Sequence, residues 1–207
     1  MWSETIETHR HVVRDATLDA AAEVVSRRGL AAATMSEIAE EAGIARATLY
    51  KYFPDVESIM IAWHERQVAH HLSQLEHARD HAEEGRRLEV VLETYALNQR
   101  ERGSSDLAPM LHPQPGRERA ARGDHLARAH QHLAELVAEL ISERARNGTL
   151  RGDIPAAELA SYCLNALAAA ESLPSAAAVR RLCAVVLAGM QPPNTAQEPP
   201  TGRIGDA

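Results

Sequence analysis

Apolar residues recur along most of the chain at helical spacing. From Arg10 to Arg28 they follow intervals of three and four residues, as on the buried face of an amphipathic helix. Few windows show the strict alternation of apolar and polar residues that is typical of strands. The pattern predicts an all-α fold of about nine helices, counting a single turn at 107–111. The other predicted helices cover residues 10–28, 34–42, 45–52, 54–81, 86–102, 117–147, 155–172 and 175–190.

Local helix signals are clearest in the first quarter of the chain. Thr34 followed by Glu37 is a capping box, in which the side chain of each residue accepts a hydrogen bond from the backbone N–H of the other. Gly43 then separates this helix from a short third helix, for which Leu49 and Phe53 form the expected buried side. Two short helices joined by a tight turn form a helix-turn-helix, which places its second helix in the major groove of DNA.

Four segments follow from this pattern. Residues 1–9 are expected to be a flexible arm, 10–54 a helix-turn-helix domain and 55–190 a larger helical domain. Pro54 is expected at the first position of the fourth helix, where its missing N–H has no cost. Residues 191–207 have too little apolar surface to order themselves, so we expect a disordered tail.

The outward-facing residues of the predicted third helix suit DNA. An arginine can read guanine with two hydrogen bonds, a threonine can contact a thymine methyl group or a phosphate, and tyrosine or lysine can hold the backbone. The start of the second helix also offers N–H groups to a phosphate. The alternative is an ordinary helical hairpin with solvated charges. The candidate DNA-binding residues are Thr34, Arg46, Ala47, Thr48, Tyr50, Lys51 and Tyr52.

The charge of the chain bears on this hypothesis. The formal net charge is −7, which argues against non-specific binding to nucleic acid. Phosphate attraction acts over about one Debye length of 8–10 Å, so the local placement of cations matters more than the total. Lys51 is the only lysine of the 207 residues. The other cations of this region are Arg10, Arg14, Arg27, Arg28 and Arg46.

Composition narrows the class of protein further. Aromatic residues make up only 3% of the chain, so its core must be built from aliphatic side chains. No apolar run reaches the roughly 18 residues of a membrane span, and no signal peptide is visible at Met1. We therefore expect a cytoplasmic protein without membrane contact. Cys163 and Cys183 do not make a disulfide framework, and they are expected to be buried inert thiols rather than redox sensors.

An ordered series of motifs spans the first quarter of the chain: Thr17-Leu18-Asp19-Ala20-Ala21, Gly29, Thr34, Ile38-Ala39, Ala42-Gly43-Ile44 and Thr48-Leu49-Tyr50-Lys51-Tyr52-Phe53-Pro54. This series closely resembles the N-terminal domain of the TetR family of transcriptional regulators. The resemblance implies a homodimer that binds a palindromic operator in double-stranded DNA. It also implies that a small molecule in the C-terminal domain releases the DNA, so we expect a repressor.

Two positions depart from the pattern of that family. The family usually has serine or threonine before the recognition helix, where this chain has Ala45 and so lacks a cap worth about 1 kcal/mol. The family usually has a lysine shortly after the phenylalanine, where this chain has Val56. The loss of one phosphate contact should weaken binding about equally for all DNA sequences. Arg10 and Arg14 are candidates to compensate.

For the C-terminal part, the resemblance implies that the last two helices pair with their copies in a second subunit; a monomer core is the alternative. The effector would occupy a mostly apolar cavity between the middle helices. The alternative is that the residues proposed to line this cavity are simple core, which is the more common role of each. The candidate ligand-binding residues are Trp63, Tyr95, Asn98, Met110, Leu111, His132, Leu133, Val137, Tyr162 and Asn165.

The histidines raise the alternative of a metal-sensing regulator, or of a helical-bundle metalloprotein that does not bind DNA. His70, His77 and His81 share one helical face, and His125 and His132 form a similar pair. Neutral imidazoles at such spacing can bind zinc, nickel or cobalt. Charged neighbours instead indicate a solvated face, so we expect no metal and no cofactor. We also expect no enzyme, because the sequence has no phosphate-binding loop, nucleophile elbow or paired-carboxylate motif.

Overall fold

The computed structural model describes residues 2–103 and 118–192. Within these ranges the chain forms eight α-helices, two short 3₁₀ segments and no strand, which confirms the all-α fold. The turn expected at 107–111 and nearly all of the expected tail lie outside the described residues. The elements are α1 (Trp2–Arg28), α2 (Met35–Glu41), α3 (Arg46–Leu49), α4 (Val56–His81), η1 (Glu84–Arg86), α5 (Arg87–Gly103), α6 (Glu118–Arg146), α7 (Ala156–Ala168), η3 (Ala169–Ser172) and α8 (Ala176–Gly189).

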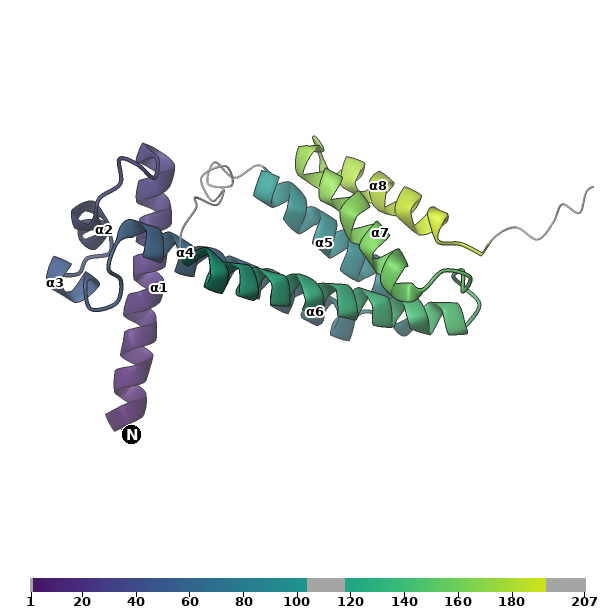
Figure 1. The fold of residues 1–207 in the computed structure, drawn as a ribbon, viewed down its shortest axis with the longest axis horizontal. Coiled ribbons are helices and arrows are strands. Elements are labelled where there is room, and N and C mark those ends of the chain that lie inside the picture. Colours follow the sequence, from purple (N-terminus) through teal and green to yellow (C-terminus); the bar gives the residue numbers. More distant parts are fainter. Residues whose placement is uncertain (1, 104–117, 193–207) are drawn as a thin grey trace, which may run out of the picture.

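Two hydrophobic cores divide these helices. The N-terminal core is built where α1, α2, α3 and the start of α4 meet, and Leu18, Ile38 and Leu49 are fully buried in it. The C-terminal core joins the rest of α4 with α5 to α8. Figure 1 shows the first group of helices standing at one end of the elongated second group, with α4 leading from one to the other.

Helix α4 belongs to both cores. Ile59 and Met60 are buried with the N-terminal helices, whereas Leu75 is buried with the C-terminal ones. The N-terminal core therefore extends past residue 55, where the sequence placed the boundary. Between the two cores the Arg66 guanidinium on α4 forms ion pairs with Asp15 and Asp19 on α1. A displacement of α4 would thus be felt directly by α1.

Three predicted helix boundaries are wrong. Helix α1 begins at Trp2, so residues 2–9 are helical rather than a flexible arm; the segment before Gly29 contains no glycine or proline to end a helix. Helix α4 begins at Val56, with Asp55 as its cap, instead of at Pro54. Helix α3 ends at Leu49 and continues only as turns, because the residue before Pro54 is disfavoured in helical conformation.

The Asp55 cap explains the shift at α4. The Asp55 carboxylate accepts a hydrogen bond from the Ser58 N–H at 2.7 Å. In return, the Asp55 N–H donates to the Ser58 hydroxyl oxygen at 3.4 Å. This is a second capping box, with serine at the position usually held by glutamate. Within the described ranges, no helix is both long and apolar enough to cross a membrane.

Candidate nucleic-acid interface and effector cavity

The predicted helix-turn-helix is present. The Thr34 hydroxyl oxygen accepts from the Glu37 N–H at 3.3 Å, and the Glu37 carboxylate accepts from the Thr34 N–H at 3.1 Å, which confirms the capping box. In the turn, Gly43 has φ +66°, a left-handed conformation that glycine adopts without steric cost. The Ile44 N–H donates to the Ala39 carbonyl at 3.0 Å and closes the turn. Leu49 and Phe53 are buried as predicted, which fixes α3 against the domain.

Helix α3 presents its predicted reading face to solvent. Arg46, Ala47 and Lys51 are exposed, and the Tyr50 side chain is 45% exposed. The Arg46 guanidinium donates to the Tyr50 hydroxyl at 3.2 Å and lies 5.4 Å from the centre of its ring. The pair therefore forms one donor-rich unit on the surface. Arg46 would have to turn away from Tyr50, or take it along, to reach the edge of a base.

Two of the candidate DNA-binding residues also have structural roles. Tyr52 packs against the N-terminal core and is only partly exposed. The single hydroxyl proton of Thr34 is donated to the Glu37 carboxylate at 2.9 Å. A DNA phosphate only accepts hydrogen bonds, so it would have to replace Glu37 as the acceptor of that proton. The cap thus competes with the phosphate contact expected of the Thr34 side chain.

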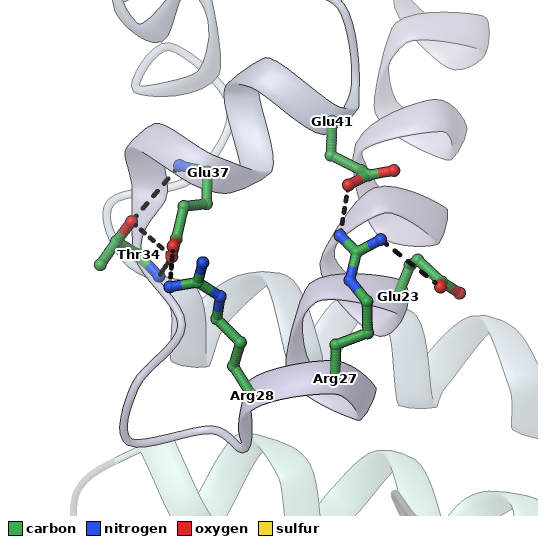
Figure 2. A network of polar contacts seen from close by, with 6 residues as sticks. All are labelled: Glu23, Arg27, Arg28, Thr34, Glu37 and Glu41. Carbon is green, nitrogen blue, oxygen red and sulfur yellow. Dashed lines mark hydrogen bonds and ion pairs between the residues drawn. The ribbon is translucent and has the colours of Figure 1, made fainter.

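Two ion pairs, Arg27–Glu41 and Arg28–Glu37, link α1 to α2, as Figure 2 shows. Arg27 reaches Glu41 and Glu23, and the Arg28 guanidinium lies 2.5 Å from the Glu37 carboxylate. The hydrogen bonds from Thr34 and the charge of Arg28 lower the pKa of Glu37 below its usual value. Arg27 and Arg28, two of the cations that lie near the DNA-binding motif in the sequence, therefore form ion pairs within the domain.

Arg14 is better placed than these two to reach DNA. Its guanidinium lies 5.8 Å from the centre of the Phe53 ring, just beyond the end of α3, and its side chain is partly exposed. An arginine over an aromatic face keeps its charge and most of its donors. Val56, where the family usually has lysine, follows close by and packs partly against the core. The position of Arg14 supports the idea that it replaces the missing lysine.

Ala45 is the N-cap of α3 and makes no side-chain capping bond, as predicted. Its φ of −67° and ψ of 138° are the extended values of an N-cap residue, so a serine fits there without rearrangement. We expect Ala45→Ser to raise the free energy of unfolding by about 1 kcal/mol. Urea unfolding followed by circular dichroism would measure the gain. Ala45→Val, which has no hydroxyl, should give none; an equal gain from both variants would contradict the capping account.

A half-open cavity of about 70 Å³ lies between α4, α5 and α6. Its wall is largely apolar and also carries amide, imidazole and guanidinium groups. The cavity is smaller than the roughly 300–1000 Å³ of typical drug-sized sites. Its wall consists of Val68, His71, Leu72, Leu75, Tyr95, Asn98, Gln99, Arg102, Ala129, His130 and Leu133.

The structure brings only some of the candidate ligand-binding residues to this cavity. Tyr95, Asn98 and Leu133 line it. The others lie elsewhere. Trp63 packs against the N-terminal core, and Val137 is buried in the C-terminal core. The His132 Nε2 lies 3.0 Å from the Glu76 carboxylate, which accepts the hydrogen bond, Tyr162 is 48% exposed, and Asn165 donates to the Ser161 carbonyl. Met110 and Leu111 lie outside the described residues.

The wall also contains His71 and Arg102, which were not among the candidate ligand-binding residues, although Arg102 shares one face of α5 with Tyr95 and Asn98. Burial, and next the charge of Arg102, lower the pKa of His71. Neutral imidazole is therefore favoured there.

The histidines do not form a metal site in the described parts of the chain, where no three histidine, cysteine or acidic side chains come together to hold an ion. His77 and His81 stack on each other with ring centres 3.8 Å apart. The side chain of His125 is outside the description. Both cysteines are buried, and burial raises the pKa of Cys163 to about 12 and that of Cys183 to about 11. Such thiols stay protonated and inert near neutral pH, as expected.

Comparison with known proteins agrees with this geometry. Residues 18–62 match the sequence model described as bacterial regulatory proteins, tetR family. An uncharacterised HTH-type transcriptional regulator of Mycobacterium tuberculosis, found in strains CDC 1551 and H37Rv, is 31% identical over 134 residues, which are 65% of this chain and 67% of the relative.

Solved structures share the whole fold at lower identity. A TetR/AcrR-family regulator from Thermobifida fusca superposes with a TM-score of 0.72 at 18% identity, over 85% of this chain and 97% of that one. FadR from Bacillus subtilis, in complex with stearoyl-CoA, gives 0.65 at 16% identity, over 85% and 98%. A TetR regulator from Haloarcula marismortui gives 0.67 at 15% identity, over 86% and 98%.

Proposed function

The chain belongs to the TetR family of transcriptional regulators, and we propose that it is a repressor that a small, mostly apolar effector releases from a palindromic operator. DNA binding is supported above all by the exposed surface of α3 and the turn after it, which presents Arg46, Tyr50 and Lys51. The fully buried Leu49 anchors this surface to the domain. Phosphate contacts position such a helix and base contacts specify the sequence. A repressor of this kind acts in the cytoplasm and needs no catalytic group.

A homodimer is part of this proposal. One side of α8 leaves Ala177, Ala184, Val185 and Ala188 exposed around the charged Arg181, and Val185 is 66% exposed. Small apolar residues on an uncovered helix face allow a second helix to approach closely. On the neighbouring α7, the Tyr162 hydroxyl lies 3.3 Å from the position that a Cβ on Gly189 would take, so the two helices present one continuous surface. A two-fold pairing through this surface matches a two-fold operator.

The effector would act through α4. His71, Leu72 and Leu75 of this helix line the cavity, and Arg66 of the same helix holds Asp15 and Asp19 on α1. An effector that fits only an enlarged cavity would shift α4 and, through Arg66, the DNA-binding domain. The free energy available for release of the operator is then set by how much more tightly the effector binds the shifted arrangement of α4 than the original one. FadR of Bacillus subtilis, crystallised with stearoyl-CoA, illustrates that this fold is compatible with a bound small molecule.

Two substitutions, one on α3 and one in the turn after it, separate base reading from backbone contact. Arg46→Ala should cost about 1–3 kcal/mol of binding and relax the preference at one base pair in each half-site, because a bidentate contact to guanine is lost. Lys51→Ala should weaken binding to all DNA sequences alike and lower the slope of log affinity against log salt by about one per half-site. Fluorescence anisotropy with operator and scrambled duplexes across a salt series measures both.

Glu40→Gln, at an exposed position on α2, is a matched control that should leave base preference unchanged. An Arg46→Ala protein with unaltered base preference would show that Arg46 contacts only the DNA backbone. Absence of any specific binding by the wild-type protein, at every salt concentration, would contradict the proposed function.

A further inference from the structure

One buried nitrogen in the cavity wall, the Nδ2 of the Asn98 amide, has no hydrogen-bond partner among the described residues. Asn98 is only 8% exposed. Nearly all buried polar groups in proteins are hydrogen-bonded, and an unpaired donor bears the full cost of its desolvation. Asn98 lines the cavity, and its Nδ2 is closed to solvent in the free protein, so a bound molecule reaches this donor by displacing a side chain of the wall. This donor therefore points to an acceptor on the ligand.

The neighbours of Asn98 on α5 are already paired among themselves. The Gln99 amide donates to the Tyr95 hydroxyl at 2.9 Å, and the Arg102 guanidinium donates to the Gln99 carbonyl oxygen at 3.1 Å. The Tyr95 hydroxyl in turn faces the Leu164 carbonyl at 3.5 Å. This chain of hydrogen bonds positions the exposed Arg102 at the outer part of the cavity. A guanidinium has five donors, so the one given to Gln99 leaves others for a ligand.

The charge of the wall has one sign. Among the described residues that line the cavity there is a guanidinium, on Arg102, and no carboxylate. Glu101 is near enough to oppose the effect of Arg102 on the pKa of His71, but it is not part of the wall. The inner part of the wall is aliphatic, with Leu75 and Leu133 almost fully buried. The cavity thus combines an apolar interior with a cationic, donor-rich opening.

We propose that the effector is a small amphipathic carboxylate. Its carboxylate accepts from the Asn98 Nδ2 and faces the Arg102 guanidinium, while its hydrocarbon part lies between Leu72, Leu75 and Leu133. An ionised carboxylate is an acceptor with no donor, which complements two groups that only donate. A single guanidinium and a cavity of about 70 Å³ suit a compact monoanion better than a phosphate of higher charge. This assignment rests on the proposed function, because it names the effector of the same cavity.

Binding is tested first without DNA. The full chain is titrated with butanoate, hexanoate and octanoate, and with 1-octanol as a neutral molecule of equal chain length, by calorimetry and thermal shift. At least one carboxylate should bind, and octanoate should bind more tightly than 1-octanol by about fivefold or more, the upper range for an exposed ion pair. Equal or tighter binding of 1-octanol, or no binding of any carboxylate, would overturn the proposal.

Variants then separate a ligand contact from a structural role. Asn98→Leu keeps the branching and the number of side-chain heavy atoms and removes the unpaired donor, so it should raise the melting temperature of the free protein while weakening carboxylate binding about 10-fold or more. If Asn98 were needed only for structure, its substitution would lower both the melting temperature and the carboxylate affinity. Arg102→Gln should remove the preference for octanoate over 1-octanol, whereas Arg146→Gln, at the far end of α6, should not. Unchanged octanoate affinity in Asn98→Leu would show that the ligand does not accept a hydrogen bond from Asn98 and would refute the assignment.

Release of DNA is measured separately, so that the two proposals can fail independently. If octanoate binds with the expected preference but leaves the operator complex intact, the carboxylate site stands and effector-driven release is wrong. If 1-octanol releases the operator as well as octanoate does, release by an effector stands and the carboxylate assignment is wrong.

Discussion

Val185→Glu is expected to split the homodimer and to weaken operator binding by about 10²–10⁴-fold, the gain that linking two binding modules typically provides. Val185 is 66% exposed in the single chain and lies on the side of α8 that carries Ala184 and Ala188. In the dimer this side would be covered, so the new carboxylate would be desolvated. Burying a charge at an interface is costly even where a cation is near, as the exposed Arg181 is, four residues earlier on the same side of α8.

Sedimentation velocity gives the oligomeric state and anisotropy gives the DNA affinity of the same samples. The control is Asn147→Asp, which adds the same charge per protomer at an exposed site beyond the end of α6. It should remain dimeric and bind the operator like the wild type. A Val185→Glu protein that stays dimeric would place the interface on another surface. If the Val185→Glu protein is a monomer and keeps full operator affinity, DNA binding does not require the dimer.

Leu49→Ala is expected to cost about 2–5 kcal/mol of unfolding free energy and to abolish specific DNA binding. The Leu49 side chain is fully buried and belongs to α3, a helix of four residues that has no side-chain cap at Ala45. So short a helix gains little from its own hydrogen bonds and depends on tertiary contacts. The loss of Leu49 should therefore release the reading face from its fixed position, besides leaving a cavity in the core.

Leu92→Ala is the matched control, because Leu92 is equally buried but belongs to the C-terminal core. Urea unfolding should show a similar loss of stability for both variants. Anisotropy well below the melting temperature should show that Leu92→Ala still binds the operator and that Leu49→Ala does not. Specific binding by a folded Leu49→Ala protein would mean that α3 is not held by this contact.

The helix-turn-helix could be predicted from the sequence because its signals are local. The Thr34–Glu37 box joins residues three apart, and Gly43 sits where the chain needs a positive φ. Competing local signals caused the error at α4. Pro54 and Asp55 both suit a helix start, and the hydrogen bond that Asp55 accepts from Ser58 decides between them. The extended α1 could have been predicted from the absence of a helix breaker before Gly29.

The cavity was harder to predict because it depends on how three helices align. Tyr95, Asn98 and Leu133 line the cavity, as predicted from their aromatic, amide or apolar side chains in the middle of the chain. The same reasoning was wrong for Trp63, which packs against the N-terminal core. Sequence spacing gives the face of a helix but not the face of its neighbour. Arg102 carried a usable signal, since Tyr95, Asn98 and Arg102 recur at intervals of three and four residues on α5.

We propose that α3 reads a two-fold symmetric sequence in duplex DNA. The purified full chain is used to select binding sites from a random duplex library, and the selected sites are sequenced. We expect an inverted repeat with half-sites roughly one helical turn apart, and one degenerate position per half-site when the selection is repeated with Arg46→Ala. Enrichment of no motif, or of an asymmetric motif that Arg46→Ala leaves unchanged, would contradict it.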